Sequence, residues 1–250
     1  MLPPIKGFIE NTLIDWEGKI ASIVFLPKCN WRCGYCHATH LVVGDNELES
    51  IPLSAVTDLT DSHKGWIDGV VITGGEPTLH SGLDQLCEEF KGRGLLIKLD
   101  TNGSNPSVVK NLVERKLVDY IAMDMKAPLG PKYAEITRVK VDLLELHDTI
   151  EFLIGSQIDH EFRITVCPTY LGEEDVIEAA KNVRGGQRFI LQQFSPQRCL
   201  DKAFENVQPY PRERLIEWAA KCAPFVKSAY LRGEGQEAMK RGAWGVERGA

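Results

Sequence analysis

The sequence predicts an α/β protein with a mostly parallel sheet. Short apolar runs alternate with amphipathic stretches along the chain, and this alternation of strand and helix is typical of βαβ units. Several of the runs are almost continuously apolar, as expected for strands that are covered on both faces. About six such units are present, too many for a small domain and slightly few for a complete eight-unit barrel. With 250 residues and 43% hydrophobic composition, the chain can bury one large core.

The predicted elements follow one another without a repeat, a low-complexity tract or a long linker, so we expect one domain over residues 1–250. A hairpin is predicted over Ile5–Leu26, with its turn at Asp15–Lys19. Gly233–Ala250 has five glycines and no regular period, so we expect a loosely ordered tail.

The predicted core strands are Ile20–Leu26, Gly69–Ile72, Leu95–Leu99, Val118–Met123, Glu161–Val166, Arg188–Gln192 and Val226–Leu231. The predicted helices are Leu83–Lys91, Pro106–Arg115, Leu143–Leu153, Glu173–Asn182 and Arg212–Ala223.

Charge and cysteine content narrow the class of protein. The chain has 29 basic and 35 acidic residues and a net charge of −6, which argues against nucleic acid or an anionic membrane as the main partner. No apolar run approaches the roughly 18 residues of a membrane span, and the N-terminus lacks the pattern of a signal peptide. Seven cysteines, three of them within eight positions, indicate reduced thiols that serve a metal or catalysis. We therefore expect a cytoplasmic protein.

The densest group of cysteines directly follows the first core strand. Cys29, Cys33 and Cys36 have the spacing Cys-x3-Cys-x2-Cys on a short segment. Three thiolates on such a loop can hold three corners of an iron–sulfur cube and leave the fourth iron open. The same positions could also form one apolar face of a helix. Gly34 and the preceding Pro27 are poor helix residues, so this second interpretation is disfavoured.

Structural zinc is a further interpretation of the same segment. Cys33 and Cys36 would then bind the metal with help from Cys29 or a nearby histidine, His37 or His40. Zinc favours closed sites with four ligands, often built from two separated ligand pairs. The other four cysteines are scattered singly, so a second pair is missing.

Polar residues follow several of the predicted strands at their carboxyl ends, which is where ligands bind in a parallel α/β barrel. Gly74, Gly75 and Glu76 end one strand with open backbone and a carboxylate. The next two strands end in Asp100-Thr101-Asn102 and in Asp124-Met125-Lys126. Each motif alone also fits a turn or a helix cap. Their occurrence at the same end of successive strands indicates a site.

Two later strands add polar side chains to the same predicted rim. Arg163 lies inside a predicted core strand, and a buried arginine needs an anion, either a ligand carboxylate or a partner aspartate. Gln193 lies at the carboxyl end of the sixth predicted strand.

Together these motifs resemble the radical S-adenosylmethionine (SAM) superfamily. Cys29-x3-Cys33-x2-Cys36 resembles its cluster motif, and Thr73–Pro77 resembles its methionine-binding strand end. Within the superfamily the chain is most similar to the short activases of glycyl radical enzymes, of the anaerobic ribonucleoside-triphosphate reductase activating type. The similarity covers about residues 5–233, and other matching stretches are 5–8, 100–103, 124–129, 162–168 and 191–194.

The resemblance implies a partial (β/α)6 TIM-like barrel, one [4Fe-4S] cluster, bound SAM and a monovalent cation. The cluster would be held by Cys29, Cys33 and Cys36. Gly74, Gly75 and Glu76 would hold the methionyl amine, and Tyr35 would lie along the adenine. Asp100, Thr101 and Asp124 resemble positions that bind the cation and flank SAM, with Asn102 and Lys126 nearby. Arg163 would face the SAM carboxylate and Gln193 the ribose.

The function implied by the resemblance is the installation of a glycyl radical on a partner enzyme, with flavodoxin or ferredoxin as the electron donor. Longer activases carry extra cysteines after the cluster loop, whereas residues 38–72 contain none, so we expect no auxiliary cluster. The polar stretch Leu41–Leu53 is expected to be a loop near the substrate opening. Two other functions stay open: a radical SAM enzyme for a small molecule, similar to 7-carboxy-7-deazaguanine synthase, and a zinc-stabilised binding module without catalysis.

Overall fold

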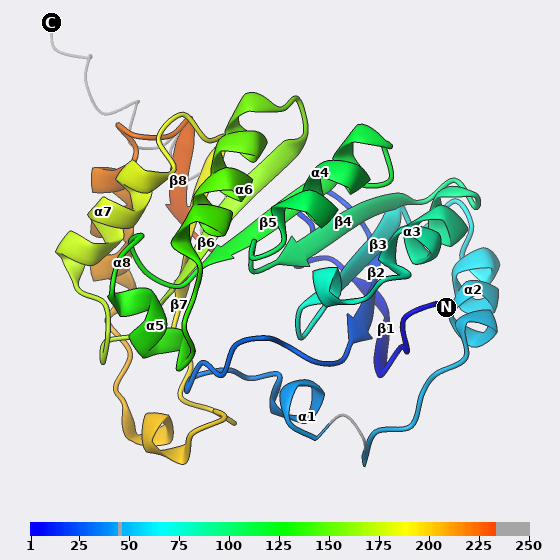
Figure 1. Ribbon diagram of the computed structural model, residues 1–250, viewed down its shortest axis with the longest axis horizontal. Coiled ribbons are helices and arrows are strands. Elements are labelled where there is room, and N and C mark those ends of the chain that lie inside the picture. The colour runs from blue at the N-terminus through cyan, green and yellow to red at the C-terminus, as the bar shows by residue number, and fades with distance from the viewer. Residues whose placement is uncertain (45–46, 234–250) are drawn as a thin grey trace, which may run out of the picture.

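Parallel strands joined by helical crossovers form the core of the structure, a computed structural model that describes residues 1–44 and 47–233 (Figure 1). Within these residues a single eight-stranded sheet has the order β1-β2-β3-β4-β5-β6-β7-β8. The strands are β1 Gly7–Thr12, β2 Ala21–Leu26, β3 Gly69–Gly74, β4 Leu96–Thr101, β5 Tyr120–Met125, β6 Asp159–Val166, β7 Arg188–Gln193 and β8 Ser228–Leu231. The strand order equals the chain order, as in a barrel that is wound in one direction.

Helices fill the crossovers on the outside of the curved sheet (Figure 1). The α-helices are α1 Thr39–Val42, α2 Leu53–Ser62, α3 Leu83–Lys91, α4 Pro106–Glu114, α5 Lys132–Thr137, α6 Leu143–Gly155, α7 Glu173–Asn182 and α8 Arg212–Cys222. Short 3-10 turns lie at Pro77–Leu79 and Lys202–Asn206. The alternation of these helices with the strands confirms the predicted α/β fold with a mostly parallel sheet. No helix in the described part of the chain is long and apolar enough to cross a membrane.

The first strand differs from the rest in direction. β1 pairs antiparallel with β2, from Gly7 opposite Phe25 to Thr12 opposite Ala21. β2 then pairs parallel with β3, and every later pair is parallel as well. The open edge strands β1 and β8 do not pair with each other. A hydrogen bond of 2.9 Å from the Tyr230 hydroxyl to Glu17 spans this opening at the hairpin turn.

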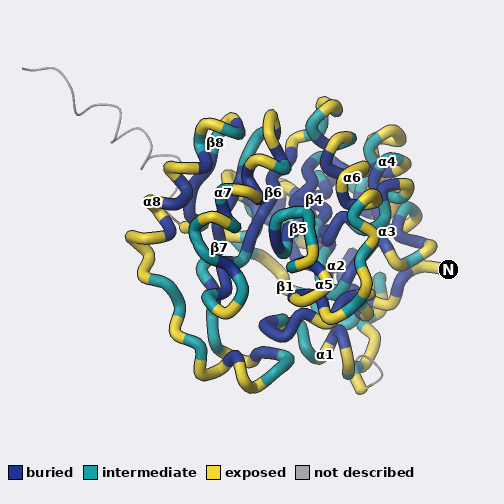
Figure 2. Tube along the Cα trace, turned by 60° about the vertical axis from the view of Figure 1, so that its left-hand side comes forward, coloured by how far each residue is buried: buried dark blue, intermediate teal, exposed yellow. Residues whose placement is uncertain are grey.

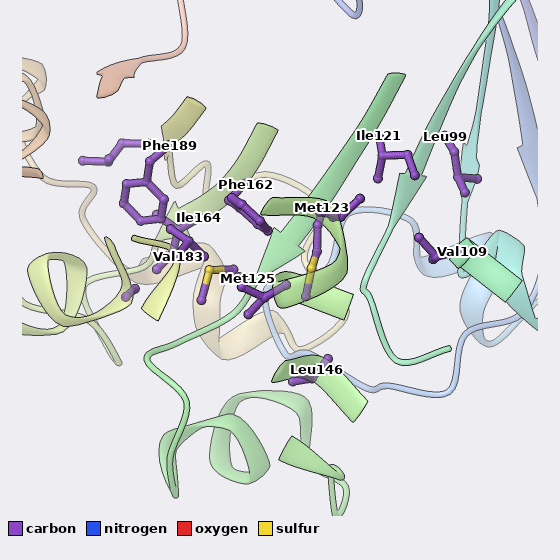
Figure 3. Close-up of a cluster of buried hydrophobic side chains, with 14 of the residues drawn as sticks. Leu99, Val109, Ile121, Met123, Met125, Leu146, Phe162, Ile164, Val183 and Phe189 are labelled. Carbon is purple, nitrogen blue, oxygen red and sulfur yellow. The ribbon is translucent and has the colours of Figure 1, made fainter. Parts of the chain in front are cut away.

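Two layers of side chains result from the alternation along each strand. The outward-facing residues pack under the helices, as Figure 3 shows for Leu99, Ile121, Phe162 and Phe189 of β4 to β7 with Val109 of α4. Figure 2 shows the same pattern along the chain trace, with dark blue strands and yellow outer sides of the helices. Successive residues of a strand point to opposite faces, so the neighbours of these residues face the interior of the barrel.

The interior layer is partly apolar and partly charged. Trp16 enters it from the hairpin turn and packs on Tyr120, with ring centroids 5.9 Å apart. Ala21, Ile23 and Val71 belong to the same small cluster. Above it, the inward positions of β4, β5 and β6 carry charged residues, which reach the carboxyl ends of the strands.

Some elements differ from the prediction. Helices α2 and α5 were not expected, because neither stretch has a long apolar stripe. Leu41–Leu53 was expected to be a loop; in the structure it contains the end of α1 and an isolated bridge from Ile51 to Ile5, and it leads into α2. Of the predicted tail Gly233–Ala250, all residues after Gly233 lie outside the described part of the chain.

Candidate active site

A cavity of about 260 Å³ lies at the carboxyl ends of strands β2 to β6. It brings together residues from the cluster loop, which follows β2, and from the ends of β3, β4 and β5. The predicted residues that line it are Cys29, Cys33, Tyr35, Cys36, Gly74, Gly75, Glu76, Asp100, Thr101, Asn102, Asp124 and Lys126. Arg163 and Gln193 are the two predicted residues outside this lining. Thr73, from the predicted strand-end motif, and His37, which was considered only as a zinc ligand, line it too. Sequence reasoning assigned no role to four further lining residues, Trp31, Ala38, Val42 and Thr165.

The cluster loop is held from one side by helix α5. The Arg32 amide donates to the Thr137 carbonyl at 2.8 Å, and the Trp31 ring packs edge-on against Tyr133 with centroids 6.0 Å apart. Trp31 is buried and itself lines the cavity. Within the loop, the Cys36 amide donates to the Cys33 carbonyl at 3.0 Å. These contacts hold the backbone of the loop between Trp31 and Cys36.

A second segment, which follows β7, holds the loop from the other side. The Leu200 amide donates to the Cys36 carbonyl and the Asp201 amide to the Gly34 carbonyl, both at 2.9 Å. A β-carbon on Gly34 would lie 2.5 Å from the Phe204 ring, so this position has no room for a side chain. The glycine within the cysteine motif therefore permits close packing against residues that are distant in sequence.

The two glycines that end β3 pack against the start of the cluster loop. A β-carbon would lie 2.2 Å from the Leu26 carbonyl oxygen at Gly74 and 1.8 Å from the Lys28 carbonyl oxygen at Gly75. The Gly75 amide donates to Leu26 at 2.8 Å, and the Glu76 amide donates to Lys28 at 2.7 Å. Gly74 also has a φ of +124°, which side chains disfavour. These glycines line the cavity and join its two principal motifs.

Glu76 is a buried carboxylate that the protein itself satisfies. One carboxylate oxygen accepts from the Thr101 hydroxyl at 2.7 Å and from the Thr78 amide and hydroxyl; the other accepts from the Asn102 amide at 2.7 Å. Burial raises the pKa of Glu76 above its usual range, although these donors oppose the shift. Glu76 thereby ties the end of β3 to the end of β4 at the cavity wall.

Arg163 lies beneath the cavity between two of its carboxylates. Its Nε donates to Asp124 at 2.7 Å and its Nη1 to Asp100 at 3.2 Å, while Lys126 approaches Asp124 at 3.5 Å. Burial would raise the pKa of Asp124, but Arg163 and Lys126 outweigh it and lower that pKa to about 2. Asp124 is therefore held as a carboxylate. Of the two anions considered for Arg163, the structure supplies the partner aspartates.

Two residues of the cavity lining each have a buried side-chain oxygen with no hydrogen-bond partner among the described residues: the hydroxyl of Tyr35 and Oδ1 of Asp100. That Asp100 oxygen faces the Lys98 ammonium at 3.6 Å. The Tyr35 ring packs edge-on against Phe194 and Phe204, with centroids 6.4 Å and 6.3 Å away.

Gln193 is turned away from the cavity. Its amide nitrogen donates to the Tyr210 carbonyl at 2.8 Å. The preceding Gln192 lies opposite Thr165 in the β6–β7 register and approaches its hydroxyl at 3.4 Å. Because Thr165 lines the cavity, Gln192 is the glutamine on the interior face.

The donor set fits an iron–sulfur cluster better than a single ion. Cys29, Cys33 and Cys36 are all free thiols on one cavity wall. Among the described residues, no three histidine, cysteine or acidic side chains converge as a single-metal site would need. In a cubane cluster each thiolate binds a different iron, so the sulfurs lie farther apart. Burial raises the pKa of Cys29 to about 11, so cluster binding must release protons.

The fold and the cavity match a known class of protein. The sequence profile of the Radical SAM superfamily matches residues 23–183, and this chain belongs to that superfamily. It is a radical SAM enzyme, with the iron–sulfur cluster and SAM that the superfamily implies. A relative in Methanocaldococcus jannaschii, provisionally named a glycyl-radical enzyme activating enzyme, is 30% identical over 224 residues, which cover 88% of this chain and 91% of the relative.

Other similarities are partial or concern the fold alone. The 7-carboxy-7-deazaguanine synthase of Neisseria meningitidis is 33% identical over 117 residues, 46% of this chain and 48% of that protein. A structure of TYW1 superposes with a TM-score of 0.60 at 15% identity, covering 82% of this chain and 74% of TYW1. A domain of pyruvate-formate lyase-activating enzyme from Bacteroides vulgatus gives a TM-score of 0.51 at 16% identity, covering 66% and 99%. These two structures support the barrel fold.

Proposed function

We propose that the protein is an activase that installs a glycyl radical on a partner enzyme. The observation that carries the proposal is that three free cysteines and the ends of β3, β4 and β5 line the same cavity. Similarity to a relative named as a glycyl-radical enzyme activating enzyme extends over 88% of this chain, which supports this substrate class. The expected client is the anaerobic ribonucleotide reductase, and flavodoxin or ferredoxin is the expected electron donor.

In this proposal the chain's own residues bind and orient. Cys29, Cys33 and Cys36 would hold the cluster. Gly74, Gly75 and Glu76 would hold the methionyl amine, Tyr35 would lie along the adenine, and Asp100 would flank the ligand. When bound, the cluster would supply the one electron that reductive cleavage of SAM to methionine needs, and the abstracted hydrogen atom would come from a glycine of the partner enzyme. The products are 5′-deoxyadenosine and the glycyl radical.

The resemblance also implies a monovalent cation beside Asp100, Thr101 and Asp124, but the proposal does not require one. Arg163 already places a positive charge between the two aspartates. We therefore expect that replacing potassium by a bulky organic cation has little effect on SAM binding. A strong dependence on potassium would contradict this expectation.

The test is electron paramagnetic resonance of the anaerobically reconstituted protein with SAM, reductant and the glycyl radical ribonucleotide reductase of the same organism. A glycyl doublet on the partner is the expected result. The matched control is the Cys33→Ala variant, which should give no doublet. Cleavage of SAM to 5′-deoxyadenosine without a doublet would exclude this client and retain the radical chemistry.

The second candidate function is radical chemistry on a small molecule. The observation that favours it is the partial similarity to 7-carboxy-7-deazaguanine synthase, 33% identity over 117 residues. That similarity covers about half of each protein, whereas the activase relative matches nearly end to end. Stimulation of SAM cleavage by a small metabolite, and not by a protein, would select this function.

A further inference from the structure

Glu161, on strand β6, is the centre of a charged network inside the barrel. Its side chain is 3% exposed. One carboxylate oxygen contacts the Arg232 guanidinium at 2.5 Å, and the other accepts from the Tyr120 hydroxyl at 2.9 Å. Lys98 and Arg163 approach the first oxygen at 3.7 Å and 3.9 Å. One buried carboxylate thus faces three cations.

The same cations reach the cavity of the active site. Lys98 lies 3.6 Å from the Asp100 oxygen that has no hydrogen bond. Arg163 contacts the other Asp100 oxygen at 3.2 Å and Asp124 at 2.7 Å. Glu161 itself does not line that cavity; it lines a second one of about 380 Å³, together with Lys98 and Arg232. The network therefore connects the two cavities through Lys98 and Arg163.

Charge balance explains what Glu161 does for Asp100. Lys98 has two carboxylates within 4 Å, Asp100 and Glu161. Without the Glu161 charge, Asp100 would be the only carboxylate near Lys98, and Arg163 would have one carboxylate fewer. Buried cations that lose a partner are strongly attracted to the nearest remaining anion. The Asp100 carboxylate would then be drawn toward Lys98 and away from its place in the cavity lining.

We propose that Glu161 is a positioning residue for SAM binding, which shares Lys98 and Arg163 with Asp100 and so keeps the Asp100 carboxylate in its place in the lining of the active-site cavity. This inference rests on the proposed binding of SAM at the active-site cavity. The lowered pKa of Glu161, which Lys98, Arg163 and Arg232 cause despite its burial, is consistent with a permanent negative charge. No pattern in the sequence singles out Glu161, because its partners come from β4, β5, β6 and the residue after β8.

The experiment measures SAM binding to the reconstituted holoenzyme by calorimetry, with iron content and thermal midpoint in parallel. Glu161→Gln should retain iron and bind SAM about tenfold more weakly, within the range for residues of one ion-pair network. The double variant Glu161→Gln with Lys98→Met removes one anion and one cation together, so SAM affinity should return to near the wild-type value. Asp159→Asn is the matched control, since Asp159 lies two residues earlier on β6 and pairs with Arg188 at the surface.

The outcomes separate the inference from the proposed function. Restored affinity in the double variant supports the charge-balance role, because a merely structural role would make the two substitutions additive. Three results would overturn it. SAM affinity could be unchanged in Glu161→Gln, or the double variant could bind SAM no more tightly than Glu161→Gln. Asp159→Asn could also lose as much SAM affinity as Glu161→Gln. Failure of the wild-type holoenzyme to bind SAM would instead overturn the proposed function.

Discussion

The backbone of Gly75 contacts the backbone of Lys28 where the end of β3 meets the start of the cluster loop. A β-carbon at Gly75 would lie 1.8 Å from the Lys28 carbonyl oxygen. The Lys28 backbone has a φ of 67°, which is uncommon for a residue with a side chain. The same oxygen accepts from the Glu76 amide at 2.7 Å. The position of the cysteines relative to the strand ends thus depends on one backbone junction.

Gly75→Ala should disrupt this junction. The methyl group meets backbone atoms that cannot rotate away, so the loop must move as a whole. We expect a loss of about 3 kcal/mol in the free energy of unfolding of the apo-protein, as for severe overpacking, and less iron bound after reconstitution. Urea unfolding and iron analysis measure the two effects.

Gly155→Ala is the control for that variant. Gly155 ends helix α6, and nothing lies within 4 Å of a β-carbon built there. We expect Ala to be neutral or to stabilise by about 0.5 kcal/mol. Similar unfolding free energies for the two variants would contradict the importance of the junction.

Cys33→Ala should abolish cluster binding and SAM cleavage together, because two thiolates cannot hold the cube. The control is Cys87→Ala on helix α3. Cys87 is fully buried and does not line the cavity, so its loss should cost about 1 kcal/mol of stability and leave the iron content unchanged. Visible absorbance and iron analysis of both reconstituted variants distinguish them. Full SAM cleavage by Cys33→Ala would refute the cluster assignment.

Glu76→Gln should weaken SAM binding and retain iron. A glutamine has one acceptor oxygen, whereas both Glu76 oxygens accept hydrogen bonds, so we expect about 2 kcal/mol of lost stability. The raised pKa of Glu76 gives this difference a pH dependence. The folded state takes up a proton more readily than the unfolded state, so wild-type stability from this group falls as the pH rises. The difference in unfolding free energy between the wild type and Glu76→Gln should be larger at about pH 5 than at about pH 8. Urea unfolding at the two pH values measures it.

Arg163→Met should destabilise the protein by about 3 kcal/mol at pH 7, because Asp100 and Asp124 lose a buried partner. In the wild type, the pKa of Asp124 is lowered from 3.8 to about 2. Its contribution to stability is present above pH 3.8 and is lost as the pH falls toward 2. The difference between variant and wild type should therefore shrink on acidification. Chemical denaturation across this range is the measurement.

Lys181→Met provides the surface comparison for Arg163→Met. Lys181 pairs with Glu178 at 2.9 Å, and both side chains are about half exposed. Its loss should cost less than about 1 kcal/mol. An equal cost for the buried and the surface variant would contradict the role assigned to Arg163.

Helices with a strong apolar period were predicted well. Leu83–Lys91 and Glu173–Asn182 have the predicted bounds in the structure. Helices α2 and α5 were not predicted, although α5 holds the cluster loop through Thr137 and Tyr133. A helix of six residues has too few turns to show a period, and tertiary contacts stabilise it.

The glutamine at the end of β7 shows where sequence patterns lose resolution. Gln192 and Gln193 are adjacent, and both fit a polar strand end. A shift of one residue in a strand exchanges its two faces. The register with β6 puts Gln192 opposite Thr165, whereas Gln193 bonds to Tyr210 on the other side.

The sequence by itself determined the strand–helix alternation, the three cysteines and the polar strand ends, because these patterns are local and depend on spacing along one segment. Only the tertiary structure decided which atoms meet: Gly75 with Lys28, Arg163 with two aspartates, and Glu161 with three cations. Such contacts join strands separated by tens of residues, and their partners are fixed by sheet register and by the cost of leaving buried charges unpaired.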